Sequence, residues 1–149
     1  MTQPRTPHVI LMADDDPEDR ELVRDALEAA EVSCDFREVA DGEELLEYLL
    51  HNGRYSAGDT APLPDLIFLD LNMPRIAGFE ALAQIKADAR IASIPILVLS
   101  TSSTPEQIEK AYASGAQTYL VKPSSFGKYV EAMKSARNYW YDIAVLPER

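Results

Sequence analysis

Short, continuous apolar runs alternate along this chain with longer segments in which apolar residues recur every three or four positions. Continuous apolar runs are typical of parallel β-strands that are covered on both faces. Apolar residues at helical spacing indicate amphipathic helices with one buried face. We predict strands at residues 9–12, 34–40, 65–70, 94–99 and 118–121.

A helix is predicted after each strand. The first begins at Pro17 with Asp16 as its N-cap, because proline suits the first helical position and aspartate accepts a bond from a free N–H group. Further helices are expected at 43–50, at about 78–87, after Thr104 and after Ser124 or Ser125. The last two helices are expected to bury Ile108, Ala111 and Tyr112, and Phe126, Tyr129, Val130 and Met133. The polar segment 51–64 is interpreted as a long surface loop.

Five strands that alternate with five helices define the expected fold class. The pattern implies an α/β protein with a doubly wound parallel sheet and helices on both faces. Right-handed crossovers leave few topologies, and the flavodoxin-like strand order 2-1-3-4-5 is favoured. We expect a flexible lead at residues 1–7, one folded domain at 8–138 and an apolar extension at 139–149.

Composition and charge disfavour several classes of partner. The 149 residues are 46% hydrophobic. No apolar run approaches the ~20 residues that a membrane helix needs. The net charge is −11, from 25 acidic and 14 basic residues that do not cluster, so binding to nucleic acid or to an anionic membrane is not expected. A single cysteine excludes an intrachain disulfide and fits a reducing compartment, which favours a cytoplasmic protein.

Acidic and polar side chains follow four of the predicted strands at the point where each strand ends. Asp14 and Asp15 follow the first strand and Asp70 follows the third. Ser100 follows the fourth strand and Lys122 follows the fifth. In an open doubly wound sheet the site lies at the carboxyl ends of the strands, near the switch in strand order. We therefore expect these groups to converge on one edge of the sheet.

This set of groups favours phosphoryl chemistry. Three crowded carboxylates repel one another and stay ionised only when a cation compensates them. Oxygen ligands without nearby His or Cys favour Mg²⁺ or a similar ion such as Mn²⁺. Lys122 adds a positive charge, and the Ser100 hydroxyl adds a hydrogen-bond donor. Together they describe a pocket for a phosphoryl group on a carboxylate nucleophile, for which Asp70 is the candidate.

The motifs and their order resemble the response-regulator receiver domain, the phospho-acceptor of two-component signalling. The resemblance covers about residues 8–140. The matching positions are the acidic pair Asp14 and Asp15, the phosphorylated Asp70, the loop residues Asn72, Pro74 and Gly78, the switch residues Ser100 and Tyr119, and the pair Lys122-Pro123. A cis peptide before this proline is usual in the family and would help to aim the lysine.

The resemblance implies a signalling protein rather than an enzyme, with Mg²⁺-dependent gain and loss of a phosphoryl group at Asp70. A sensor histidine kinase is the implied donor. Asp15, Asp70 and the Asn72 carbonyl would hold the metal, and Asp14 would act through a water molecule. Lys122 would pair with Asp70 or a phosphoryl oxygen. Ser100 would move to the phosphoryl group and Tyr119 would turn inward, which changes the surface of the fourth helix, fifth strand and fifth helix.

The long loop at 51–64 and the tail at 137–147 resemble stand-alone regulators that partner bacterial phytochromes and related histidine kinases. The tail is too apolar for a free end, so it either packs back on its own domain or forms a homodimer interface. We favour homodimerisation. The candidate contact residues are Tyr139, Trp140, Tyr141, Ile143 and Leu146.

Other functions on a similar sheet are less favoured. A phosphatase of the haloacid-dehalogenase type also uses an aspartate nucleophile, and Asp14 and Asp16 resemble its Asp-x-Asp pair. That family needs a further aspartate cluster after the lysine, whereas the acids beyond Lys122 are scattered. A binding module that takes no phosphate is disfavoured by the complete set of site residues. A flavin-binding protein is disfavoured because the acidic rim would repel the flavin phosphate.

Overall fold

The five predicted strands form one parallel sheet in the order β2-β1-β3-β4-β5, which confirms the predicted topology. The computed structural model describes residues 8–58 and 60–147, so the predicted lead at 1–7 lies outside the described residues. The strands are β1 (Val9–Ala13), β2 (Asp35–Val39), β3 (Leu66–Leu69), β4 (Ile96–Ser100) and β5 (Thr118–Val121). The helices are α1 (Pro17–Ala29), α2 (Gly42–Leu50), α3 (Gly78–Ala87), α4 (Pro105–Ala113) and α5 (Phe126–Arg137), with a 3₁₀ turn η1 (Gly53–Tyr55) and a π-helical segment η2 (Asn138–Ile143).

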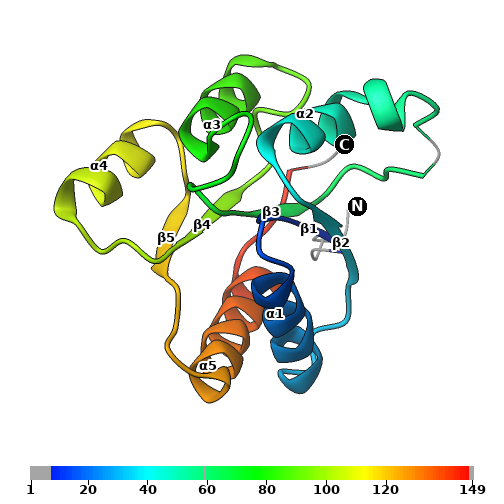
Figure 1. The fold of residues 1–149 in the computed structure, drawn as a ribbon. Helices are drawn as coiled ribbons and strands as arrows, with labels where there is room; N and C mark the ends of the chain where they lie inside the picture. Colours follow the sequence, from blue (N-terminus) through cyan, green and yellow to red (C-terminus); the bar gives the residue numbers. More distant parts are fainter. Residues whose placement is uncertain (1–7, 59, 148–149) are drawn as a thin grey trace.

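Helices cover both faces of the sheet, as the doubly wound fold requires. Helices α1 and α5 lie on one face, and α2, α3 and α4 lie on the other (Figure 1). Every residue of β1, β3 and β4 is buried. These central strands are covered on both sides, which explains why they appear in the sequence as continuous apolar runs. The edge strands β2 and β5 are mostly half-buried.

The strand register brings the carboxyl ends of neighbouring strands together. Ala13 at the end of β1 pairs with Leu69 at the end of β3. Ser100 at the end of β4 pairs with Val121 at the end of β5. The next residue along β1, β3 and β5 is therefore Asp14, Asp70 and Lys122 respectively, at one edge of the sheet.

Two residues that were predicted to lie on buried helix faces are exposed. Tyr112 in α4 is 49% exposed, because its side chain reaches the edge strand, where its hydroxyl accepts a hydrogen bond from the Tyr119 N–H at 3.1 Å. Phe126 is 44% exposed, because it is the first residue of α5 and lies before the part of the helix that packs on the sheet. Tyr129 and Met133 are buried, as predicted.

The segment 51–64 lies mostly on the surface, as predicted, and one end of it is anchored to α2. The Tyr48 hydroxyl donates to the Pro62 carbonyl at 2.8 Å. His51 has a left-handed backbone conformation, and its Nε2 atom lies 2.7 Å from the carbonyl oxygen of Ala61, which is buried. The segment therefore stays mostly on the surface, and its far end is held in place because the side chains of Tyr48 in α2 and of His51 at the C-cap of α2 lie against its backbone carbonyls.

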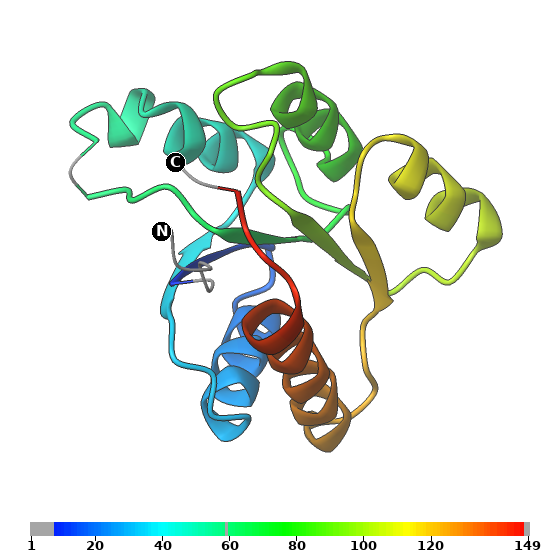
Figure 2. The same cartoon turned by 180° about the vertical axis from the view of Figure 1, so that it is seen from behind.

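The tail after α5 packs on its own domain. Trp140 and Leu146 join the apolar core between the sheet, α1 and α5. The Tyr141 hydroxyl donates to the Ser33 carbonyl at 3.0 Å. Figure 2 shows the tail passing from the end of α5 across the sheet, and Leu146 lies beside Ile94 near the amino ends of β3 and β4. The tail therefore lies at the opposite end of the strands from Asp70.

No helix within the described ranges is long and apolar enough to cross a membrane.

Candidate functional site

Asp14 is completely buried at the end of β1. Its backbone N–H donates to the Val39 carbonyl at 3.2 Å, and its own carbonyl accepts from the Arg20 guanidinium at 2.7 Å. One carboxylate oxygen accepts the Asp16 N–H at 2.9 Å, and the other lies 2.9 Å from Lys122 Nζ. Burial raises the pKa of Asp14, although the hydrogen bond from Lys122 acts in the opposite direction. Both carboxylate oxygens of Asp14 are therefore held by hydrogen bonds in the buried part of the site.

Asp70 is 5% exposed at the end of β3. Its N–H donates to the Ala13 carbonyl at 2.9 Å, and one carboxylate oxygen accepts the Asn72 N–H at 3.2 Å. Burial, and then the negative charge of Asp14, raise the pKa of Asp70 to about 6. The carboxylate form of Asp70 is therefore less stable than that of an exposed aspartate, and a bound cation would favour it.

Asp14, Asp15 and Asp70 form the acidic pocket, in which one ligand oxygen from each residue lies within 4.8 Å of the other two. Asp15 is exposed, so solvent has direct access to the pocket. The donors are all carboxylate oxygens, and two of the three acids are buried, so the pocket fits a hard divalent cation such as Mg²⁺ or Mn²⁺. Asn72, the fourth predicted ligand, is exposed beside Asp70.

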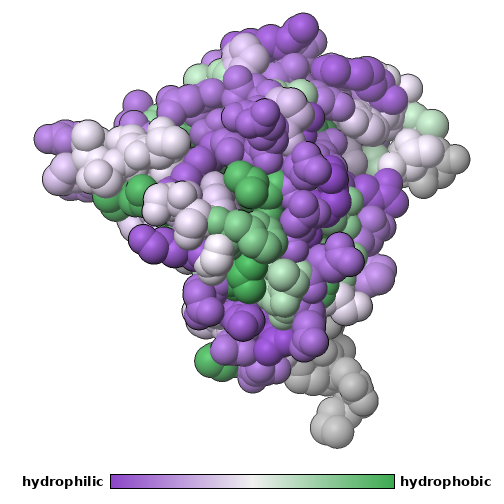
Figure 3. Space-filling view, turned by 60° about the horizontal axis from the view of Figure 1, so that its bottom comes forward, coloured by the Kyte–Doolittle hydropathy of each residue, from purple (hydrophilic) through white to green (hydrophobic). Residues whose placement is uncertain are grey.

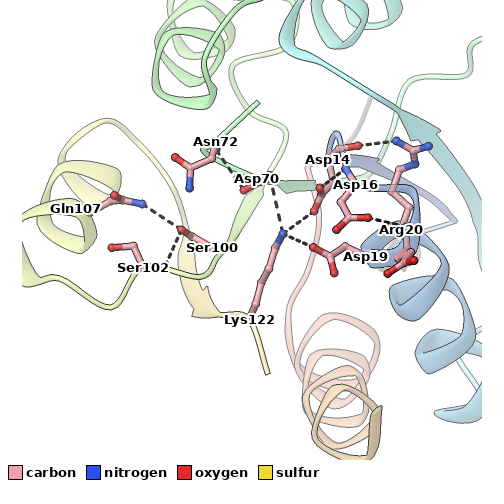
Figure 4. Close-up of polar contacts among 11 residues, drawn as sticks. Asp14, Asp16, Asp19, Arg20, Asp70, Asn72, Ser100, Ser102, Gln107 and Lys122 are labelled. Carbon is pink, nitrogen blue, oxygen red and sulfur yellow. Dashed lines mark hydrogen bonds and ion pairs between the residues drawn. The ribbon is translucent and has the colours of Figure 1, made fainter. Parts of the chain in front are cut away.

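Lys122 lies among three carboxylates (Figure 4). Its Nζ atom is 2.7 Å from Asp19, 2.9 Å from Asp14 and 3.9 Å from Asp70. Burial opposes its charge, but the hydrogen bonds with Asp19 and Asp14 outweigh burial and raise the pKa of Lys122. The peptide bond before Pro123 is trans, not cis as the family resemblance suggests, and Lys122 still reaches the pocket.

Ser100 and Tyr119 belong to a ring of hydrogen bonds beside the acidic pocket. Ser100 is fully buried, and its Oγ atom accepts the Ser102 N–H at 3.2 Å and the Gln107 amide at 3.1 Å. The same amide nitrogen donates to the Tyr119 hydroxyl at 3.3 Å. The Tyr119 hydroxyl donates to the Ser102 carbonyl at 2.8 Å, which closes the ring.

The sequence also predicts the role of Asp16 correctly. Its side chain accepts the Glu18 N–H at 2.9 Å and caps α1. Since Asp16 is exposed and occupied in capping, the resemblance of Asp14 and Asp16 to a phosphatase Asp-x-Asp pair loses its basis.

Asp19 and Gln107 contact the site, and neither was predicted. Both are the third residue of a helix that follows a strand ending at the site. Because the amino ends of these helices face the same edge as the carboxyl ends of the strands, this shared position was the signal that could have identified them.

The fold and the acidic edge of the sheet place this protein in the class of flavodoxin-like α/β proteins with a carboxylate and lysine pocket. Residues 10–145 match the response regulator receiver domain. The chain belongs to this family, as the sequence motifs suggested.

Relatives of the chain are response regulators, and two of the similar solved structures are described as phytochrome or red-light regulators. The response regulator Rcp1 of Synechocystis sp. is 30% identical over 141 residues, which cover 95% of this chain and 94% of Rcp1. A response regulator in red light signalling of R. palustris, RPA3017, has a TM-score of 0.89 at 34% identity, over 95% of this chain and 99% of that one. The phosphorylated cyanobacterial phytochrome response regulator RcpA has a TM-score of 0.86 at 34% identity, with the same coverage of both chains. The predicted similarity to phytochrome response regulators is confirmed.

Proposed function

We propose that Asp70 accepts a phosphoryl group from a sensor histidine kinase and that the chain then switches its α4, β5 and α5 surface. The observation that carries this proposal is the position of Asp70, a buried acid that shares a pocket with Asp14 and Asp15 and lies 3.9 Å from Lys122. Burying a carboxylate among other acids costs folding free energy, so such a residue is a candidate for a functional role. The neighbouring Asp15 is exposed, so the pocket that contains Asp70 is open to solvent on that side.

In the proposed reaction a carboxylate oxygen of Asp70 attacks the phosphorus of a phosphohistidine. The new bond joins phosphorus to this oxygen, and the bond from phosphorus to the histidine nitrogen breaks. Asp15, Asp70 and the Asn72 carbonyl would hold a Mg²⁺ or Mn²⁺ ion, with Asp14 behind them. Such an ion supplies charge neutralisation to the phosphoryl oxygens. Rcp1, one of the relatives, has been solved in a Mn²⁺-bound form.

Lys122 and Ser100 would respond to the new charge. Lys122 is positively charged and already lies between Asp14, Asp19 and Asp70, so a small movement brings it to a phosphoryl oxygen. The Ser100 hydroxyl would donate a hydrogen bond to the phosphoryl group. Tyr119 would then move as well, because Gln107 is hydrogen-bonded to both residues. The movement of these two residues would alter the surface around β5.

The partner that we propose is a histidine kinase of the bacterial phytochrome type in the cytoplasm. The similarity to RPA3017, RcpA and Rcp1 supports this choice. The net charge of −11 supports a protein partner rather than nucleic acid. The choice of kinase is tested by measuring phosphotransfer to this chain from a panel of purified histidine kinases. The fastest transfer from a phytochrome kinase supports the proposal. Faster transfer from another class of kinase overturns it.

The phosphorylation site itself is tested with Asp70→Asn. The variant is incubated with Mg²⁺ and either acetyl phosphate or a phosphorylated kinase, and aspartyl phosphate is measured as hydroxylamine-sensitive label. We expect complete loss of the label in Asp70→Asn. Asp16→Asn is the matched control, because asparagine also caps a helix and the Asp16 side chain is occupied in capping α1. Undiminished label in Asp70→Asn would exclude Asp70 as the acceptor.

We also propose that the exposed side of the tail forms a homodimer interface. Trp140 and Leu146 are buried within the chain, so among the predicted contact residues Tyr139 and Ile143 are the ones that face outward, at 51% and 70% exposed. Val145 is also 70% exposed. On the face that carries α1 and α5, hydrophobic residues form an interrupted strip in a hydrophilic surface (Figure 3). The Ile143→Asp variant should lower the mass measured by light scattering from dimer to monomer, and an unchanged mass would defeat the dimer proposal.

A further inference from the structure

Arg20 connects the backbone of the acidic pair to strand β2. It lies in the first part of α1, and its side chain is 18% exposed. Its guanidinium donates through Nη1 to the Asp14 carbonyl at 2.7 Å (Figure 4). Through Nε it donates to a Glu38 carboxylate oxygen at 3.1 Å. Glu38 lies in β2, beside Met12 of β1. The guanidinium therefore bridges the end of β1 and the neighbouring strand.

Asp15 is held by its backbone and not by its side chain. Within the part of the chain that the structure describes, no hydrogen bond or ion pair holds the Asp15 carboxylate. The peptide unit before Asp15 is held, because its carbonyl belongs to Asp14 and accepts from Arg20. The peptide unit after Asp15 is held as well, because its N–H belongs to Asp16 and donates to the Asp14 carboxylate at 2.9 Å. The direction of the Asp15 side chain therefore depends on these two backbone bonds.

The arrangement that Arg20 holds is the one that suits a cation. One oxygen each of Asp14, Asp15 and Asp70 lie within 4.8 Å of one another while the bond from Arg20 is made. Without this bond the peptide unit before Asp15 would be free to rotate, and a cation would have to order Asp15 as it binds. Ordering a side chain and its backbone costs free energy. Loss of the bond from Arg20 therefore weakens metal binding.

Charge alone gives the opposite expectation. Arg20 is a cation beside the acidic pocket, so its removal would make the pocket more negative and would strengthen the binding of a divalent ion. Glu38 lies 3.1 Å from the guanidinium and offsets part of this charge, which leaves the effect of geometry as the larger one. We propose that Arg20 is a positioning residue that keeps Asp15 in place for the metal. This inference rests on the metal site of the proposed function.

The test measures Mn²⁺ binding to the full chain from the EPR signal of the free ion. Groups that orient metal ligands typically contribute about tenfold to metal affinity, so the dissociation constant of Arg20→Met should be about tenfold higher than that of the wild type. Arg24→Met is the matched control. Arg24 is also in α1 and pairs with Glu38, but among the described contacts it makes none with Asp14. Its loss should leave Mn²⁺ affinity unchanged or slightly higher.

Arg20→Lys separates geometry from charge, because it keeps the cation. An ammonium group lacks the fixed fork with which the guanidinium contacts Asp14 and Glu38 together, so we expect Mn²⁺ binding about twofold to threefold weaker than in the wild type. Thermal unfolding in EDTA establishes which variants are folded. If Arg20→Met does not fold, Arg20→Lys decides alone, and unchanged binding by it overturns the inference.

Asp15→Asn identifies the Mn²⁺ that binds in the acidic pocket, because the substitution removes one of the three ligand carboxylates. Unchanged or tighter binding by Arg20→Met, or an equal loss in Arg24→Met, overturns the role of Arg20 while the metal site stands. If the wild type shows no Mn²⁺ binding that Asp15→Asn removes, the metal site of the proposed function is overturned together with this inference.

Discussion

The ammonium group of Lys122 lies closer to Asp19 than to Asp70. The distances from Nζ are 2.7 Å to an Asp19 carboxylate oxygen and 3.9 Å to an Asp70 carboxylate oxygen. Asp19 is the third residue of α1, which begins two residues after the acidic pair Asp14 and Asp15. Lys122 is therefore held by an acid outside the predicted site, and three carboxylates share one lysine.

Asp19→Asn should strengthen the response of the site to a phosphoryl group. The substitution removes one negative charge near the phosphoryl position and releases Lys122 toward Asp70. Charges a few ångströms apart near a surface interact by ~1 kcal/mol or more, so we expect the apparent affinity for beryllofluoride with Mg²⁺ to rise about threefold to tenfold. Fluorescence or NMR titration measures this affinity.

Glu18→Gln is the control for net charge. Glu18 precedes Asp19 on α1, is exposed and makes no ion pair with Lys122 among the described contacts. If the two variants gain affinity equally, the effect arises from overall charge, and the contact between Asp19 and Lys122 has no special role.

The acidic pocket should make the metal-free protein more stable as the pH falls below neutrality. The pKa of Asp70 is raised from 3.8 to about 6, so between these values the native state binds a proton that the unfolded chain does not. The free energy of unfolding therefore rises as the pH falls from about 6 toward about 4. Glu47 acts in the opposite direction, because hydrogen bonds from Arg54 lower its pKa from 4.5 to about 2 and its contribution is lost below pH 4.5.

Urea unfolding in EDTA over pH 4.5–7.5 measures this dependence. Asp70→Asn should flatten the slope and stabilise the metal-free protein at pH 7 by up to about 3 kcal/mol, since the pKa is raised from 3.8 to about 6 and each pKa unit corresponds to about 1.4 kcal/mol. Added Mg²⁺ should stabilise the wild type more than the variant. A wild-type stability that falls steadily from pH 7 to pH 5 in EDTA would contradict this account of the pocket.

Gly78→Ala should disturb the backbone that carries Asp70. A Cβ atom at Gly78 would lie 2.4 Å from Leu71 Cα and 2.6 Å from the Asp70 carbonyl oxygen, both of them backbone atoms. Overpacking of this kind costs about 1–3 kcal/mol, and the shift is transmitted to the residues after β3. We expect a lower melting temperature and slower phosphorylation of Asp70. Gly127→Ala is the matched control, because no atom lies within 4 Å of its Cβ position and alanine favours a helix, so it should stabilise slightly.

The convergence of Asp14, Asp70 and Lys122 was predictable because a parallel strand fixes where its carboxyl end lies. The residue after an apolar run therefore has a known place at the sheet edge. Asp19 and Gln107 lie on helices, where the direction of a side chain depends on how the helix packs. Capping and charge at a helix terminus explain these residues equally well from sequence alone. Their roles become visible only when α1 and α4 are placed against the site.

The tail illustrates the same difference for apolar residues. Trp140 and Ile143 have similar apolar character, so composition cannot distinguish a core residue from an interface residue. Packing distinguishes them: Trp140 is 9% exposed and Ile143 is 70% exposed. Packing on the parent domain and homodimer contact, which the sequence left as alternatives for the tail, therefore concern different sides of the tail.

Trp140→Ala and Tyr139→Ala should separate these two sides. Trp140 packs against Met133 and Leu27 in the core beneath the tail, so its loss should reduce the free energy of unfolding by about 3–5 kcal/mol. Tyr139 is half exposed, and its ring contacts Trp140 edge to face with 4.9 Å between the ring centroids. Replacing Tyr139 by alanine should therefore reduce the free energy of unfolding by only about 1 kcal/mol. Urea unfolding of each variant, together with light scattering, measures both effects. If Tyr139→Ala lowers the mass without lowering the stability, the outer side of the tail forms the homodimer contact; if it lowers neither, Tyr139 has no part in that contact.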